Sequence, residues 1–377
     1  MSRPVPREAI RILAPYVPGR PIEEVEAEYG IHGAVKLASN ENPLGPSPLA
    51  IEAGRKAVEE VHLYPDGSGT FLRRALSSRF GVPVDQIILG SGSSELIDLV
   101  TRAFAEPGDE IVVPQGIFRM FAVAAGRAGA SFVEVPVNED LTPDLDAMRR
   151  RIGDGTRLVA IANPNNPTGA FVRRDELARF VESLPENVLL VLDEAYFEYA
   201  SGVVDGYPDG LELLAQGRTV LVLRTFSKIS GLAGLRIGYG FGPADVVAAI
   251  NKVREPFNAN LVAQAAALAA LGDDAHRSRS RDLVVRERDF LFRELSRRVP
   301  VRVHPSIGNF LLVDLPPLAE PLDTGFGRRG VIIRPMAGWG FPGSLRVSVG
   351  NHAENVKFLE VLDELLGGAT APGVRER

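Results

Sequence analysis

The sequence predicts an α/β protein with a large domain, built on a mostly parallel sheet, and a smaller α+β domain. Short β-branched runs alternate with amphipathic helical stretches from about Ile51 onward, which is the pattern of repeated βαβ units. After Glu255-Pro256 the order changes to long helical stretches followed by strand-like runs. The 377 residues are also enough for two domains, at roughly 150 residues each.

The composition excludes several classes of function. The 42 Lys and Arg against 48 Asp and Glu give a net charge of −6, which argues against a general nucleic-acid binder. There is no Cys, and the 5 His are scattered without the spacing of metal ligands. No apolar run approaches the ~18 residues of a membrane helix, and the first residues lack a signal-peptide core. We therefore expect a cytoplasmic protein with no metal, no nucleic-acid partner and no membrane attachment.

The large domain is expected over residues 49–256, after an N-terminal arm. Residues 1–48 are rich in Pro and turn signals, which predicts an extended arm that is part of the small domain. The apolar stripe of Ser94–Ala105 predicts one of the flanking helices. Apolar runs predict roughly seven strands, at Gln86–Leu89, Glu110–Val113, Ser131–Val135, Leu158–Ala162, Val188–Leu192, Thr219–Leu223 and Ile237–Phe241.

The small domain is expected over residues 257–366. Helical patterns occur at Leu261–Leu271, Leu283–Val299 and Glu354–Leu366. Strand-like runs occur at Gly308–Val313, Val331–Arg334 and Leu345–Val349. Residues 367–377 are expected to be a flexible tail.

Two charged residues directly follow predicted strands, where ligands bind in open α/β sheets. Asp193 ends an apolar run, so its carboxylate needs a cationic partner or its pKa rises. Lys228 lies in a stretch of low charge and is a candidate amine nucleophile, because a desolvated Lys loses its proton more easily. A structural salt bridge for Asp193 and an ordinary solvated Lys228 are the alternatives.

Two further features have both a functional and a structural interpretation. Gly90–Glu95 is a Gly-rich turn that opens a helix, so it either binds a single phosphate or simply caps that helix. Arg346 alternates with Leu345 and Val347, so it is either an exposed edge-strand residue or a two-pronged ligand for a carboxylate.

A set of motifs in order suggests a family: Asn40–Pro43, Tyr64–Gly67, Pro164–Gly169, Asp193–Tyr196, Ser227-Lys228 with Gly234–Arg236, and Leu345–Gly350. Together they resemble the fold-type I aminotransferases that use pyridoxal phosphate, and within them the histidinol-phosphate aminotransferase group. The resemblance extends from about Pro15 to Leu366. It implies the fold of that family, with the large domain binding the cofactor.

The resemblance implies roles around the cofactor ring. Lys228 would hold pyridoxal 5'-phosphate as a Schiff base and move a proton between substrate and cofactor. Asp193 would pair with the protonated pyridine nitrogen. Asn166 and Tyr196 would hydrogen-bond the ring hydroxyl, and Phe118 would stack on the ring.

It also implies a phosphate site and a dimer. The backbone amides of Ser93 and Ser94, together with Ser227 and Arg236, would bind the cofactor phosphate. Tyr64 would reach that phosphate from the other subunit, so a homodimer with shared active sites is implied.

The substrate is expected to contact Arg346, Arg334 and Asn42. Arg334 ends an apolar run before Pro335, and the fork of an Arg suits a carboxylate or phosphate. The predicted reaction passes an amine from histidinol phosphate to a 2-oxo acid such as 2-oxoglutarate, in histidine biosynthesis.

Three other functions stay open at this point. One is an aromatic amino acid aminotransferase acting on phenylalanine or tyrosine, and another is a lyase of the phosphothreonine decarboxylase type. A transcription regulator with a catalytically inactive aminotransferase domain is disfavoured, because only residues 1–48 precede the pattern, too few for a DNA-binding module.

Overall fold

A computed structural model describes residues 3–11, 13, 15 and 17–367 of the chain. The tail predicted at residues 367–377 lies, apart from Gly367, outside the described residues. The centre is a seven-stranded sheet in the order β2-β8-β7-β6-β5-β3-β4. Only β8 in this sheet runs antiparallel to its neighbours, so the predicted mostly parallel α/β architecture is confirmed.

The strands of this sheet lie where the apolar runs predict them, with ends that differ by at most two residues. Strands β6 and β7 are buried along their whole length, because helices cover both faces of the sheet. The strands are β2 (Ile87–Gly90), β3 (Glu110–Pro114), β4 (Ser131–Val135), β5 (Thr156–Ala162), β6 (Leu189–Asp193), β7 (Val220–Thr225) and β8 (Gly238–Phe241).

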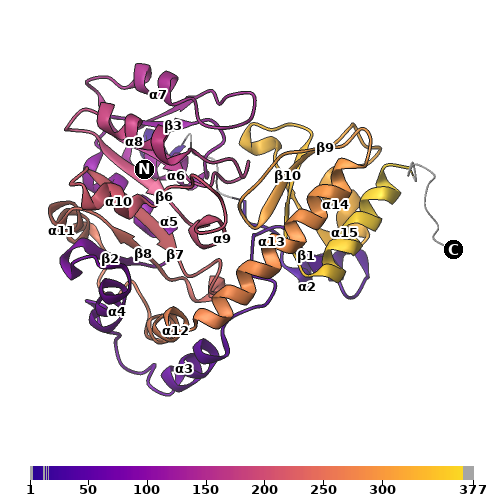
Figure 1. Cartoon of the computed structure of the whole chain (residues 1–377), viewed down its shortest axis with the longest axis horizontal. Helices are drawn as coiled ribbons and strands as arrows, with labels where there is room; N and C mark the ends of the chain where they lie inside the picture. Colours follow the sequence, from indigo (N-terminus) through magenta and orange to yellow (C-terminus); the bar gives the residue numbers. More distant parts are fainter. Residues whose placement is uncertain (1–2, 12, 14, 16, 368–377) are drawn as a thin grey trace.

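Helices pack on both faces of the large sheet and form two separate apolar cores (Figure 1). One core contains side chains of α5 (Ser93–Phe104), α6 (Met120–Ala128) and α11 (Ala244–Val253). The opposite core receives α3 (Pro48–Val58), α4 (Thr70–Phe80), α7 (Leu145–Arg151), α8 (Arg174–Ser183), α10 (Gly210–Ala215) and α12 (Leu261–Leu271). The short α9 (Phe197–Ala200) follows β6.

A second, antiparallel sheet lies beside the first, in the order β12-β13-β10-β9. It is covered by α13 (Asp274–Ser296) and α15 (His352–Leu365), and in Figure 1 α13 extends from beside α12 to the small sheet. The remaining helix of this part is α14 (Leu322–Arg328). The strands are β9 (Arg302–Val303), β10 (Phe310–Asp314), β12 (Arg334–Pro335) and β13 (Ser344–Ser348).

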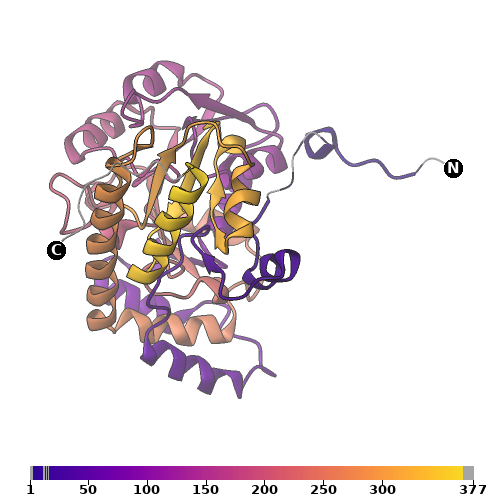
Figure 2. The same ribbon diagram turned by 90° about the vertical axis from the view of Figure 1, so that its right-hand side faces the viewer.

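The N-terminal arm is less extended than the sequence predicts. It contains the short helix α1 (Glu8–Arg11), which lies at the edge of the molecule in Figure 2 and contacts α6, and the two-turn helix α2 (Ile22–Tyr29). Helix α2 forms because Glu and Ala after Pro21 favour a helix, and Gly30 ends it with φ +64°. Strand β1 (Val35–Lys36) then pairs in parallel with β11 (Val331–Ile332), which ties the arm to the C-terminal part.

Two C-terminal elements also differ from expectation. Helix α13 begins at Asp274 rather than at the predicted Leu283. The sequence pattern does not predict its first turns, because they are polar and show no apolar stripe. The Asp273 side chain caps it by accepting the N–H of His276 at 2.9 Å. The run Val331–Arg334 divides into β11 and β12, which belong to different sheets.

The predicted domain boundaries at residues 48 and 256 fall at the start of α3 and between α11 and α12. They stay a prediction. Across the part of the chain that the structure describes, no helix combines the length and apolar character needed to span a bilayer.

Candidate active site

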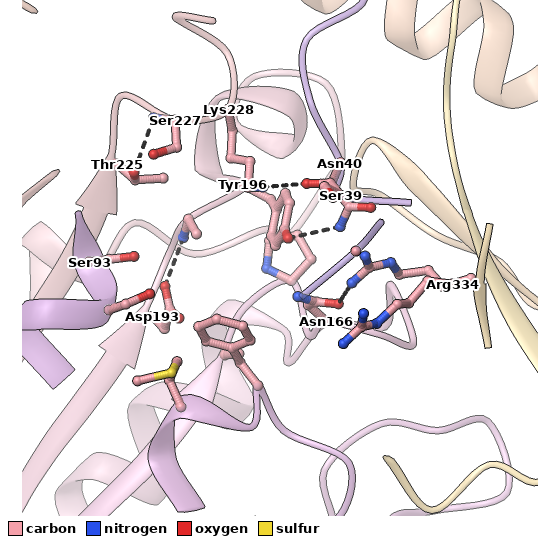
Figure 3. Close-up of a pocket in the computed structure, with 18 of the residues that line it drawn as sticks. Ser39, Asn40, Ser93, Asn166, Asp193, Tyr196, Thr225, Ser227, Lys228 and Arg334 are labelled. Carbon is pink, nitrogen blue, oxygen red and sulfur yellow. Dashed lines mark hydrogen bonds between the residues drawn. The ribbon is translucent and has the colours of Figure 1, made fainter. Parts of the chain in front are cut away.

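A cavity of about 270 Å³ lies at the carboxyl ends of β5, β6 and β7, facing the small sheet. Figure 3 shows that side chains from distant parts of the sequence point into it. The large sheet contributes Asp193 and Lys228, and the small sheet contributes Arg334 and Arg346. The segment around Ser39 closes a further side.

Asp193 is the last residue of β6, and its side chain is buried. Its Oδ1 accepts the N–H of Ala195 at 3.1 Å. Burial raises the pKa of the Asp193 carboxyl to about 6, although that hydrogen bond and the nearby Lys228 both act to lower it. The Asp193 carboxyl is therefore poorly solvated, as its position after an apolar run predicts.

Lys228 lies three residues beyond the end of β7. Its Nζ donates a hydrogen bond to the carbonyl of Ser39 at 3.0 Å. Burial lowers the pKa of the Lys228 amine to about 8, and the positive charge of Arg346 lowers it further, while Glu41 and Asp193 oppose the change. About one tenth of this amine is thus unprotonated at pH 7, and the unprotonated form is the one that attacks a carbonyl carbon.

The amino end of α5 forms an anion-binding corner with Arg236. The first amides of a helix have no partner inside the helix, and the helix dipole is positive there. Gly92 has φ +83°, and a Cβ on it would lie 2.5 Å from Nη2 of Arg236. A Cβ on Gly238 would lie 2.6 Å from the amide nitrogen of Ser93. Both glycines therefore allow this close packing around α5.

Arg236 is held at this corner by its own contacts. Its Nη1 donates to the carbonyl of Ala233 at 3.0 Å and lies 3.4 Å from Oγ of Ser227. The lining of the cavity includes Ser93, Ser94, Ser227 and Arg236 together. The charge and the free amide groups suit a phosphate.

Two arginines lie opposite each other on adjacent strands of the small sheet. Arg334 of β12 and Arg346 of β13 are direct partners in an antiparallel register, where like charges repel. Arg346 is buried rather than exposed at an edge, because β13 lies between β12 and β10. An anion bound between these side chains, separate from a phosphate at Arg236, would relieve the repulsion between the two guanidinium groups.

The two arginines are held differently. Arg346 donates through Nη1 to Oδ1 of Asn166 and through Nη2 to the carbonyl of Ala38, both at 2.5 Å. Arg334 donates through Nη2 to the carbonyl of Val17, also at 2.5 Å.

Tyr196 and Phe118 complete the wall of the cavity. The Tyr196 hydroxyl accepts a hydrogen bond from Nδ2 of Asn40 at 2.9 Å (Figure 3). Phe118 lies near Trp339 of the small-sheet side, with ring centroids 6.1 Å apart. The rings therefore come from both the large-sheet and the small-sheet sides.

Two residues proposed from the sequence do not line this cavity. Nδ2 of Asn42 donates to the carbonyl of Ile229 at 2.8 Å and to Ser280 Oγ at 2.9 Å, so it joins the arm to α13. Tyr64 is 81% exposed and stacks on Phe257 with ring centroids 4.7 Å apart. Within the described part of its own chain, Tyr64 is thus a surface residue.

Sequence reasoning missed Ser39 and Asn40. Asn40 lies in the quoted Asn40–Pro43 motif, but the sequence offers two asparagines there and no periodic pattern to choose between them. What distinguishes Asn40 is its backbone conformation in the structure, with φ +55°. Asn tolerates this left-handed region better than most residues.

Comparisons with known proteins agree with this geometry. The family model described as aminotransferase class I and II matches residues 33–362. The chain belongs to this family. The family that the sequence motifs resemble is therefore confirmed.

The most similar relatives include two curated proteins and a solved structure. This aminotransferase is 49% identical over 356 residues to the histidinol-phosphate aminotransferase of Anaeromyxobacter sp. (strain Fw109-5), covering 94% of this chain and 97% of the relative. It is 45% identical over 357 residues to histidinol-phosphate aminotransferase 1 of Nitrosococcus oceani, covering 94% and 95%. The crystal structure of histidinol-phosphate aminotransferase from Sinorhizobium meliloti in complex with pyridoxal-5'-phosphate aligns with a TM-score of 0.84 and 29% identity, covering 96% of this chain and 98% of that one.

The lowered pKa of Lys228 can be tested without any cofactor. Because its amine has a pKa of about 8, its acetylation by trace acetic anhydride should reach half its maximal rate near pH 8 in the apoprotein. Peptide mass spectrometry at Lys228 gives the rate at each pH, with urea-unfolded protein as the control. A midpoint above pH 10, as in the unfolded chain, would contradict the lowered pKa of Lys228.

Proposed function

We propose that this aminotransferase uses pyridoxal 5'-phosphate to pass the amino group of histidinol phosphate to a 2-oxo acid such as 2-oxoglutarate, in the cytoplasm. One observation carries the proposal: a single cavity combines a buried carboxyl and amine with two separate cationic corners. One corner suits the phosphate of the cofactor and the other suits the phosphate of the substrate. The names of the two curated relatives and of the Sinorhizobium meliloti structure agree with this choice.

The cofactor fits the cavity at three points. The corner at Gly92, where a Cβ would displace Arg236, suits its phosphate. Asp193, poorly solvated and with a raised pKa, suits the positive charge of a protonated ring nitrogen. Lys228 suits the aldehyde carbon, because its amine has a pKa of about 8. When bound, the cofactor withdraws electrons from the substrate carbon that bears the amine.

The residues of the chain supply the binding and the proton transfer. Asp193 keeps the ring nitrogen protonated by pairing with it in a site of low polarity. Lys228 would take the proton from the substrate carbon and deliver it to the cofactor carbon. Tyr196 and Asn166 donate hydrogen bonds to the ring oxygen, and Phe118 stacks on the ring and limits its rotation.

The phosphate of the cofactor is assigned to the corner at α5. The amides of Ser93 and Ser94 donate to it, and Ser227 adds a hydroxyl. Arg236 pairs with its charge through a two-pronged contact. These contacts fix the ring position, so the reacting carbon stays within reach of Lys228.

The substrate is assigned to the arginine pair. Histidinol phosphate carries a phosphate dianion and no carboxylate, so it needs fixed cations other than Arg236. Arg334 and Arg346 lie opposite each other on the wall of the same cavity. Asn42, which the sequence also suggested for the substrate, is omitted because it donates elsewhere.

A panel of amino donors tests the reaction itself. The cofactor-loaded protein would be mixed with histidinol phosphate, phenylalanine, tyrosine or phosphothreonine, and the loss of cofactor absorbance followed in single turnover. We expect histidinol phosphate to react with the largest specificity constant. A preference for phenylalanine or tyrosine would establish the aromatic aminotransferase instead, and release of carbon dioxide from phosphothreonine would establish the lyase.

The variant Arg334→Ala tests the substrate corner. We expect kcat/KM for histidinol phosphate to fall by roughly 30- to 1,000-fold, which is about 2–4 kcal/mol of transition-state binding and the scale for losing a charge-assisted contact, and the value for phenylalanine to fall much less. Arg329→Ala is the matched control, since Arg329 pairs with Glu320 and Glu364 on the surface of the same domain. Equal losses for both donors would show that Arg334 binds a feature common to both.

We also propose a homodimer in which Tyr64 completes the cofactor-phosphate corner of the partner. Exposed apolar side chains are frequent in the segment that carries Tyr64: Val61, Leu63 and Phe71 are 60%, 58% and 70% exposed. Exposed apolar side chains that gather in one region are typical of an association site. A second copy of the chain would cover these side chains and place its own Tyr64 hydroxyl at the cofactor-phosphate corner, which Tyr64 of the same chain does not line.

Subunit mixing tests the shared site. Lys228→Ala and Tyr64→Ala protomers should each be nearly inactive, and a mixture that reassorts statistically should recover up to about one quarter of wild-type activity. The reason is that each heterodimer holds one site with both side chains intact. Heterodimers purified from this mixture through two different tags should show about half of wild-type activity. Verified heterodimers without activity would contradict the proposal.

A further inference from the structure

Arg224 and Glu194 form an ion pair directly behind the cavity, and both side chains are 0% exposed. Asp193 is the register partner of Leu223, so Glu194 and Arg224 are the next residues along β6 and β7. Side chains alternate along a strand. Glu194 and Arg224 therefore point into the core that contains Leu192 and Val222, whereas their neighbours Asp193 and Thr225 line the cavity.

The pair is closely fitted, although Nη1 of Arg224 is buried and has no hydrogen-bond partner among the described residues. Arg224 donates to Oε2 of Glu194 through Nε at 2.9 Å and through Nη2 at 2.7 Å. Oε1 of Glu194 accepts the N–H of Gly210 at 2.8 Å, and a Cβ on Gly210 would lie 3.0 Å from that oxygen. Nη2 of Arg224 also reaches Oδ1 of Asp209 at 2.7 Å. The guanidinium lies 3.5 Å from the ring centroid of Phe197.

Stability alone is a weak reason for such a pair. Removing two ions from water costs several kcal/mol each, and apolar residues of similar volume often replace a buried pair without loss. Two donors of Arg224 that converge on Oε2 of Glu194 do, however, restrict the relative position of the two strand ends. This contact spans the two strands whose ends carry Asp193 and Lys228.

A short chain of contacts links Arg224 to the reactive amine. Arg224 precedes Thr225, whose Oγ1 accepts the N–H of Ser227 at 3.1 Å. Ser227 precedes Lys228. On the other strand the N–H of Glu194 donates to the carbonyl of Leu223 at 2.8 Å, which extends the β6–β7 ladder past Asp193. Any slip between the strand ends therefore moves Asp193 relative to Lys228.

We propose that Glu194 and Arg224 are positioning residues that hold the ends of β6 and β7 in register, so that Asp193 and Lys228 engage one bound cofactor together. The inference rests on the proposed roles of Asp193 and Lys228. Neither Glu194 nor Arg224 touches the cavity, so their effect on the reaction passes through the backbone.

The variant Arg224→Lys keeps the charge and removes the paired Nε and Nη2 donors. We expect kcat to fall about tenfold to a hundredfold, the scale for a small misplacement of reacting groups, with KM changed by less than about threefold. Titration of the cofactor absorbance should show that the pKa of the Lys228–cofactor linkage rises by about half a unit or more. The rise follows because a poorly placed Asp193 no longer keeps positive charge on the ring, and that charge disfavours a proton on the linkage.

Two reference proteins make the readout specific. Asp193→Asn removes the negative charge opposite the ring nitrogen, so the linkage pKa of Arg224→Lys should move in the same direction as in that variant. Arg298→Lys is the matched control, because Arg298, just after α13, also donates through Nε and Nη2 to one carboxylate, that of Asp363 in α15. It should lower Tm by a few degrees and leave kcat and the linkage pKa unchanged.

A purely structural role would lower Tm in Arg224→Lys while kcat and the linkage pKa stayed at wild-type values, and this result would overturn the proposal. If Arg224→Lys does not fold, Glu194→Gln is used, because it keeps an oxygen for the N–H of Gly210. It should show the same two changes, and failure of both variants to fold would assign the pair to stability and reject the inference. A wild-type protein that binds the cofactor through Lys228 but ignores histidinol phosphate would refute the proposed substrate only, since the linkage pKa is measured without substrate.

Discussion

The loss of water around Asp193 and Lys228 is the constraint on which the rest of the site depends. Burial moves their pKa values toward each other, to about 6 for Asp193 and about 8 for Lys228. The free energy of unfolding is therefore lower above pH 6 than below pH 4 by about 3 kcal/mol from Asp193 alone, since its folded pKa is raised from 3.8. The fold tolerates this cost because a bound cation at Asp193 and a carbonyl carbon at Lys228 would remove it.

That constraint explains why the site needs two sheets. The large sheet brings Asp193 and Lys228 together because parallel neighbours end at the same edge, and it leaves the amino end of α5 beside them. It supplies one cationic corner, at Arg236. The small sheet supplies the other, since Arg334 and Arg346 face each other across β12 and β13. An anionic cofactor and an anionic substrate can thus bind side by side without sharing a cation.

Elements with a local signal were predictable from sequence, and those that depend on distant partners were not. The seven strands of the large sheet follow from apolar runs, because buried strands need continuous hydrophobic sequence. The first turns of α13 carry no apolar stripe, so their helix was missed. The division of Val331–Arg334 depends on pairing with β1, some 300 residues away, which no local pattern encodes. In the site, Lys228 and Asp193 were found at strand ends, while Asn40 was missed because only its backbone angle distinguishes it from Asn42.

The two arginines of the substrate corner differ in how firmly they are held, and this difference suggests a different role for each in substrate binding. Arg346 is buried, and it is fixed by the side chain of Asn166 and the carbonyl of Ala38, so its position is set before any substrate arrives. Arg334 contacts the carbonyl of Val17 in the N-terminal arm. A phosphate dianion competes well for that contact, because a charge-assisted hydrogen bond is roughly twice as strong as a neutral one. Under the proposed function, Arg346 orients every amino donor, and Arg334 discriminates the phosphorylated donor from the others.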